Sequence, residues 1–257
     1  MLGLLAGLGI TLCGQAAIPD SLEALAKKYQ LKIELLTESR QWNFSNYRVE
    51  ADAPSPSDLE RYTKLFVSEW ERYPPSVIQS ARLKRIVIGS NIRMNGQVRA
   101  AVPAFEADTM FYDTTLGAKN PSYQRSVIHH EFFHMMDERQ GLLYGDPEWG
   151  GLNPAGFHYG NGGDKMRTRG TGILSDSLPY VLTPYASSDI AEDKAEFFSH
   201  MLVDPEFVAK RAKADPVISA KVDLMKRRLN KWNSAFDDGF WKTKAAGFQP
   251  VTKRPVP

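Results

Sequence analysis

The stretch HHEFFHMMDE, residues 129–138, holds three of the five histidines in the 257-residue chain. His130 and His134 are four residues apart, so on a helix they project from one face, about 40° apart. Two imidazoles placed in this way can bind one metal ion together. Glu131 flanks that face, where a carboxylate can take a proton from a water molecule on the ion. The spacing therefore predicts a helix that carries two metal ligands and a general base.

The other positions of this stretch fit a helix as well. Ile128, Phe132 and Met135 fall together on the opposite side and form an apolar stripe for the core. Asp137 returns to the histidine face, where it can accept the N–H of a ligand imidazole and so fix the orientation of the ring. The alternative is an amphipathic helix whose two histidines lie at the surface and bind no metal.

A catalytic zinc site requires a third protein ligand and one open position. The metzincin pattern would place a histidine six residues after His134, but Gln140 stands there. In YASSDIAEDKAEFFSH, residues 185–200, Glu192 and Glu196 are four residues apart on a predicted helix and share one face. We expect Glu192 to bind the metal and Glu196 to bond to a ligand histidine. The alternative is an acidic first turn that complements the helix dipole, which does not explain Glu196 beside two phenylalanines.

These segments make the chain resemble the gluzincin clan of zinc metallopeptidases. The resemblance is to the branch of anthrax lethal factor and the MtfA-like proteins, and to secreted bacterial zinc-binding metallopeptidases. HEFFHMMD (130–137) matches a HExxHxxD form, and YASSDIAEDKAEFF (185–198) carries the second part of the likeness. WGGLNPAGFHYG (149–160) also resembles a WxxLNPxGFxYG segment of the secreted group. The similarity extends over roughly Leu83 to Asp204.

The resemblance implies a peptidase with one Zn²⁺ per chain, bound by His130, His134 and Glu192. Glu131 then takes a proton from the attacking water and later delivers it to the leaving amine. The resemblance also implies an acid four residues after the glutamate ligand, and Glu196 occupies that position. The expected cofactor is therefore zinc, and the expected reaction is hydrolysis of peptide bonds.

Further positions are candidates for contact with the substrate. In those families a tyrosine seven residues before the glutamate ligand points at the metal, and this spacing selects Tyr185 as a donor to the oxyanion. Tyr180 is the second candidate for this role, and a packed aromatic ring is the alternative for Tyr185. His158 lies in a connection rich in glycine and asparagine and is a candidate substrate-binding residue. A sheet edge at 97–105 or 110–113 would accept an extended peptide by strand addition.

The order of periodic patterns predicts an α+β fold of zincin-like type. Strand patterns occur at 31–37, 47–51, 85–90, 97–103 and 110–113, between helical patterns, and only helices are predicted after residue 190. We expect a small mixed or antiparallel sheet packed on the helix at 121–139, followed by a mostly helical C-terminal part. Residues 17–245 would form this single domain, and residues 246–257 a loose tail.

Composition and the first residues limit the partners and the location. Lys+Arg is 32 and Asp+Glu is 30, so we expect a peptide or protein substrate and no nucleic acid. The uncharged run at 1–13 is too short to span a bilayer, and no stable membrane span is expected. Its length, followed by Gly14-Gln15-Ala16, predicts a signal peptide over residues 1–16 and export from a bacterial cytoplasm. A buried N-terminal helix and a lipid anchor at Cys13 are the alternatives.

The sequence is compatible with two functions. The first is a zinc-dependent metallopeptidase, favoured because a purely structural metal site has no use for a base at Glu131. The second is a zinc-binding regulatory or protein-interaction protein without proteolytic activity, as the MtfA-like relatives make plausible. The sequence holds no readable pattern for cleavage specificity or oligomeric state.

Overall fold

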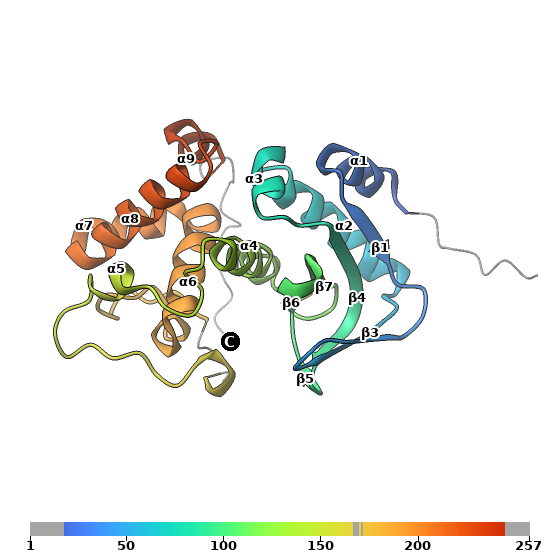
Figure 1. Cartoon of the computed structure of the whole chain (residues 1–257), viewed down its shortest axis with the longest axis horizontal. Coiled ribbons are helices and arrows are strands. Elements are labelled where there is room, and N and C mark those ends of the chain that lie inside the picture. Colours follow the sequence, from blue (N-terminus) through green and yellow to red (C-terminus); the bar gives the residue numbers. More distant parts are fainter. Residues whose placement is uncertain (1–17, 167–169, 171, 245–257) are drawn as a thin grey trace, which may run out of the picture.

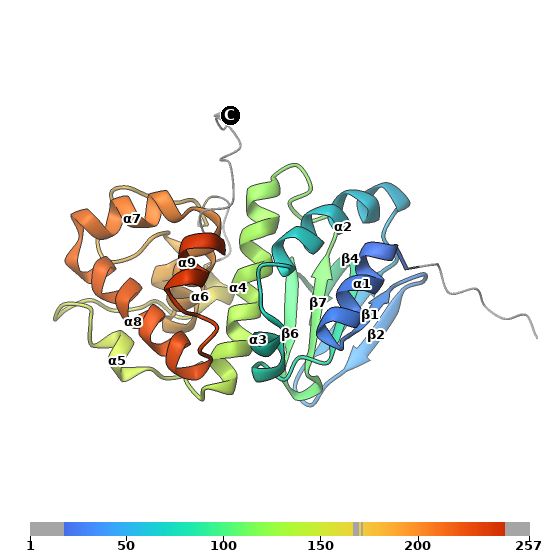
Figure 2. The same ribbon diagram turned by 90° about the horizontal axis from the view of Figure 1, so that it is seen from above.

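The computed structural model describes residues 18–166, 170 and 172–244. It shows an α+β architecture with a mixed seven-stranded sheet. The sheet and helices α1 to α3 lie on one side of the central helix α4, and helices α5 to α9 lie on the other side (Figures 1 and 2). The predicted signal peptide, Cys13 and the predicted tail lie outside the described residues. Within the described ranges, no helix is both long and apolar enough to cross a membrane.

The sheet is built around one long buried strand, β4. The strands are β1 (Lys32–Leu35), β2 (Arg40–Asn43), β3 (Arg48–Asp52), β4 (Arg85–Met94), β5 (Gln97–Val98), β6 (Ala101–Ala104) and β7 (Thr109–Asp113). Their order is β2-β3-β4-β7-β6, and β1 and β5 also pair with β4. The β1 and β7 strands run parallel to β4, whereas the other pairings are antiparallel. In the described part of the chain, β6 pairs only with β7 and is an edge strand.

The observed strands confirm the mixed sheet and extend it. Each predicted strand is present, and the turn at Asn95-Gly96 has positive φ at both residues, 51° and 80°, as a tight hairpin requires. The predicted strand at 97–103 is divided into β5 and β6. The β2 strand was not predicted, because its sequence RQWN has no apolar alternation and it forms by pairing with β3.

The helices cover one face of the sheet and form the C-terminal half. They are α1 (Asp20–Tyr29), α2 (Pro56–Trp70), α3 (Pro75–Ser80), α4 (Pro121–Arg139), α5 (Pro147–Gly150), α6 (Ile190–Val203), α7 (Pro205–Ala214), α8 (Pro216–Trp232) and α9 (Asp238–Lys244). Short 3₁₀ turns occur at η1 (Phe105–Ala107), η2 (Gly163–Lys165) and η3 (Tyr185–Ser188). The predicted helix bounds at 121–139 agree with α4, and α3, α5 and α9 were not singled out.

Helix α4 is buried on both sides. Its apolar stripe is fully buried as predicted, and Phe132 packs on Trp70 with ring centroids 4.9 Å apart. Its histidine side is covered by α6, so His130 and His134 are only 6% and 8% exposed. The alternative of two surface histidines is therefore wrong.

The long connection between α4 and α6 is held by the C-terminal helices. Arg211 of α7 donates to the carbonyls of Ser175 and Leu178. Lys221 of α8 donates to the carbonyl of Tyr180 at 2.9 Å. Buried backbone groups need such partners. These contacts fix an irregular segment that leads directly into η3.

Candidate metal centre

Three side chains from α4 and α6 converge in the structure. His130 Nε2 lies 2.9 Å from Glu192 Oε2 and 3.2 Å from His134 Nε2. His134 Nε2 lies 3.4 Å from the same Glu192 oxygen. One nitrogen or oxygen from each residue lies within 4.8 Å of the others, so this group could hold a metal ion. The fold thus brings together the three predicted ligands.

Local sequence explains how α4 and α6 present these residues. Asn120 begins α4 by accepting the N–H of Tyr123, and Asp189 begins α6 by accepting the N–H of Ala191. Glu192 consequently lies in the first turn of α6. The two helices lie side by side (Figures 1 and 2).

The group is electrostatically prepared for a cation. Burial alone would lower the pKa of His130, but hydrogen bonds to Glu192 and Glu196 outweigh it and raise the pKa well above the ordinary value. Burial alone would raise the pKa of Glu192, but contacts with His130 and His134 bring it well below the ordinary value. The carboxylate of Glu192 is therefore ionised, which is the form that binds a metal ion.

Glu196 lies behind the first histidine, as predicted. Its Oε1 is 3.0 Å from His130 Nδ1, while its Oε2 accepts from Thr183 at 2.8 Å and lies 3.5 Å from His200 Nε2. Burial alone would raise the pKa of Glu196, but contacts with His130 and His200 lower it far below the ordinary value. An ionised Glu196 accepts Nδ1–H of His130, so Nε2 is the nitrogen that can act as a ligand when a metal ion takes the place of its proton.

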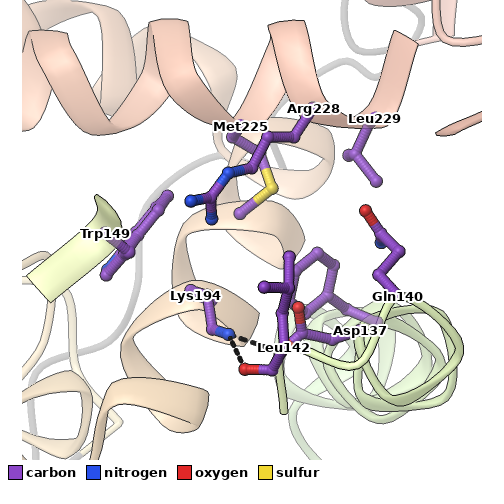
Figure 3. Close-up of a pocket in the computed structure, with 9 residues that line it drawn as sticks. Asp137, Gln140, Leu142, Trp149, Lys194, Met225, Arg228 and Leu229 are labelled. Atoms are coloured by element: carbon purple, nitrogen blue, oxygen red, sulfur yellow. Dashed lines mark hydrogen bonds and ion pairs between the residues drawn. The ribbon is translucent and has the colours of Figure 1, made fainter. Parts of the chain in front are cut away.

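Asp137 does not make its predicted bond to a ligand histidine. Its Oδ2 lies 2.6 Å from the ammonium of Lys194, and His134 Nδ1 has no hydrogen-bond partner within the described part of the chain. The physical reason is that Lys194, almost completely buried, needs an opposite charge. Burial outweighs this pairing and raises the pKa of Asp137. Asp137, Lys194 and Arg228 line a cavity of about 10 Å³, and Figure 3 shows how these side chains lie.

The predicted general base is next to His130 in the chain, and the predicted tyrosine lies near the candidate ligands. Glu131 is half-buried and directly follows His130 on α4. Tyr185 projects from η3, with its ring centroid 6.0 Å from that of His130. A Cβ added at Gly163 would lie 2.5 Å from both Tyr185 Oη and Glu192 Oε1, so the hydroxyl and the carboxylate flank the same glycine.

The second tyrosine candidate lies elsewhere. The ring of Tyr180 packs on Phe157 with centroids 6.1 Å apart, and its N–H is bonded to Asp215 at 2.8 Å. Its backbone is in the left-handed region, with φ of 68°. The structure therefore brings Tyr185, rather than Tyr180, to the ligand group.

The segment at 149–160 packs beside the site without adding a ligand. Trp149 Nε1 donates to Asp193 at 2.8 Å, and Tyr159 Oη donates to the same oxygen at 2.6 Å. Asp193 directly follows Glu192, so these bonds hold the start of α6. His158 is exposed, and among the described residues it does not join the metal-binding group.

Sequence reasoning missed two residues of the site. The sequence did contain an indication of Gly163, because this residue ends the run GNGG at 160–163. Glycine is common where another group approaches the backbone closely. The sequence contained no indication of Thr183, since a single threonine in a long connection resembles any other loop residue. Its partners Glu196 and Ala186 become visible only in the fold.

Comparisons with known proteins found no matching family model, no matching curated protein and no matching solved structure. Two imidazoles and one carboxylate can bind a divalent cation and leave coordination positions open for water and substrate. The hydroxyl of Tyr185, which flanks the same glycine as Glu192, adds a hydrogen-bond donor, and Glu131 is next to His130 in the chain.

Proposed function

We propose that this protein is a zinc-dependent metallopeptidase of gluzincin type. One observation carries the proposal: the carboxylate of Glu192 lies within 3.4 Å of a ring nitrogen of both His130 and His134. Glu131 is in the same helical turn as His130. Two nitrogens and one oxygen suit Zn²⁺, and three protein ligands with an open position are typical of catalytic zinc. Structural zinc sites usually have four protein ligands, so this donor set favours an enzyme over a purely regulatory zinc protein.

The chain's own residues would perform the proton transfers. Bound zinc would supply the Lewis acidity that polarises a peptide carbonyl and acidifies water. Glu131 takes the proton of the attacking water and delivers it to the leaving amine. The hydroxyl of Tyr185 donates a hydrogen bond to the oxyanion that develops on the carbonyl. Glu196 keeps the ring of His130 in the ligating orientation.

The edge strand β6 supports a peptide as the substrate. Ala100, just before β6, and Val127 of α4 border the same narrow gap, which is too small for a water molecule. Phe105, just after β6, accepts a hydrogen bond through its carbonyl from Arg139 at the end of α4. The strand therefore runs alongside the part of α4 that carries HEFFH. An extended peptide added to this edge would pass the metal centre, as a zincin-like fold requires.

The test compares the wild type with Glu131→Gln on a peptide library read by mass spectrometry. We expect the wild type to cleave peptides, and the variant to bind as much zinc but cleave none. Glu138→Gln is the matched control, because Glu138 lies on the same helix and pairs with Arg139. Full activity of Glu131→Gln would refute the mechanism. A zinc-loaded wild type that cleaved nothing would favour the regulatory alternative.

A further inference from the structure

Thr183 is a buried polar residue between the metal centre and the turn that carries Tyr185. It is 0% exposed and belongs to neither a helix nor a strand. A hydroxyl removed from water in this way needs hydrogen-bond partners. Thr183 has two such partners, the carboxylate of Glu196 and the backbone amide of Ala186. Glu196 contacts His130, and Ala186 is next to Tyr185 in the chain.

The hydrogen bonds of Thr183 have defined directions. Its Oγ1 lies 2.8 Å from Glu196 Oε2, and an ionised carboxylate can only accept, so the hydroxyl hydrogen points to Glu196. The same Oγ1 lies 3.0 Å from the backbone nitrogen of Ala186, which can only donate. The other oxygen of Glu196 accepts from His130 Nδ1 at 3.0 Å. One unbroken chain thus runs from the amide of Ala186 to a ligand imidazole.

We propose that Thr183 is a positioning residue that sets the orientation of the His130 ring and of the Tyr185 turn together. This inference rests on the proposed function, because it assigns a task to the same site. Without the hydroxyl, Glu196 Oε2 would keep one partner among the described residues, His200 Nε2 at 3.5 Å, and its carboxylate could rotate away from His130. The amide of Ala186, next to Tyr185, would also lose its partner.

Thr183 is a positioning residue because it acts on the ligand imidazole through Glu196. Thr183 and His130 both donate to that carboxylate, so the hydroxyl fixes where the carboxylate lies, and the carboxylate in turn fixes the ring of His130. A structural contact would contribute only to the stability of the fold. A positioning contact also changes the affinity for the metal and the surroundings of the bound ion.

The test replaces Thr183 by valine, which has nearly the same shape without a hydroxyl. We expect Thr183→Val to bind zinc about 10- to 100-fold more weakly than the wild type in competition with a chelator. The visible absorption of the Co²⁺-loaded protein should shift as well. Thr183→Ser, which keeps the hydroxyl, should restore both readouts. Thr183→Ala serves as a second hydroxyl-free variant if the valine variant does not fold.

Thr63→Val is the matched control. Thr63 is also buried, and its Oγ1 has no hydrogen-bond partner among the described residues, so its loss should leave zinc affinity unchanged. Wild-type zinc affinity and an unchanged cobalt spectrum in Thr183→Val or Thr183→Ala would overturn the inference. That result is distinct from failure of the proposed function, which is judged by peptide cleavage in the zinc-loaded wild type.

Discussion

The carboxylate of Glu192 lies 2.9 Å from Nε2 of His130, although 62 positions separate the two residues in the chain. The contact exists because α4 and α6 pack side by side, with Phe133 and Phe198 in contact at a centroid distance of 5.0 Å. Both helices pack in the core, and this packing determines where the three candidate ligands lie.

Replacement of Tyr185 by phenylalanine should reduce catalysis without loss of metal. Its hydroxyl flanks the same glycine as the Glu192 carboxylate, and loss of one oxyanion donor typically lowers kcat by about 10² to 10³. Steady-state kinetics and zinc analysis of Tyr185→Phe measure the two effects separately. Tyr144→Phe is the control, since Tyr144 is 87% exposed. An unchanged kcat in Tyr185→Phe would remove Tyr185 from the mechanism.

A methyl group added at Gly163 should disturb the centre directly. The new Cβ would lie 2.5 Å from both Tyr185 Oη and Glu192 Oε1, closer than atoms can approach. Both atoms are the ends of side chains, which can shift, so the methyl group would displace the Glu192 carboxylate and the Tyr185 hydroxyl. We therefore expect weaker zinc binding and lower activity in Gly163→Ala. Gly145→Ala is the control, because a Cβ there meets nothing within 4 Å. Equal zinc affinity in the two variants would contradict the described geometry.

Removal of one partner from the buried Lys221–Asp193 ion pair should destabilise the fold strongly. The ammonium of Lys221 lies 2.7 Å from Asp193, and both side chains are fully buried. Lys221→Met would leave the buried carboxylate of Asp193 without a cation, and the carbonyl of Tyr180 would lose its donor. We expect the free energy of unfolding to fall by about 3–5 kcal/mol. Urea unfolding measures this loss. Lys210→Met should change stability little, because the Lys210–Asp176 pair is exposed, and a similar loss in both variants would refute the prediction.

A second buried cluster lies around His129, on another side of α4. Glu69 Oε2 is 2.8 Å from His129 Nε2, and Tyr73 donates to His129 Nδ1 at 2.6 Å. Burial outweighs the contact with Glu69 and lowers the pKa of His129, so the ring is neutral at pH 7. Burial alone would raise the pKa of Glu69, but its contacts with His129, Arg125 and Arg72 bring it to about 2.

This cluster should lose stability in acid. The stabilisation from Glu69 is present above its unfolded pKa of 4.5 and disappears as pH falls toward about 2. His129 also makes the protein less stable in acid. Its pKa in the folded protein is below 6.5, so as pH falls the unfolded chain binds a proton at His129 before the folded protein does. Urea unfolding between about pH 6 and pH 3 should therefore show a smaller loss for Glu69→Gln than for the wild type. Glu60→Gln should follow the wild type, and parallel curves for all three proteins would contradict the assignment.

The local parts of this structure were predictable from the sequence. HEFFH with its apolar stripe specified α4, and the pair Glu192 and Glu196 specified the face of α6, because both patterns repeat within one or two helical turns. The partner of Asp137 could not be predicted in this way. Lys194 reaches Asp137 only because two helices pack, and this tertiary contact takes the place of the expected bond to His134.

The most direct test of the account is the zinc content of the wild type and of Glu192→Ala, each purified without added zinc and measured by elemental analysis. Glu148→Ala, an exposed glutamate outside the site, is the control. The account predicts about one zinc per chain in the wild type and the control, and much less in Glu192→Ala. A wild type that binds no zinc even when zinc is offered, or equal zinc in all three proteins, would contradict it.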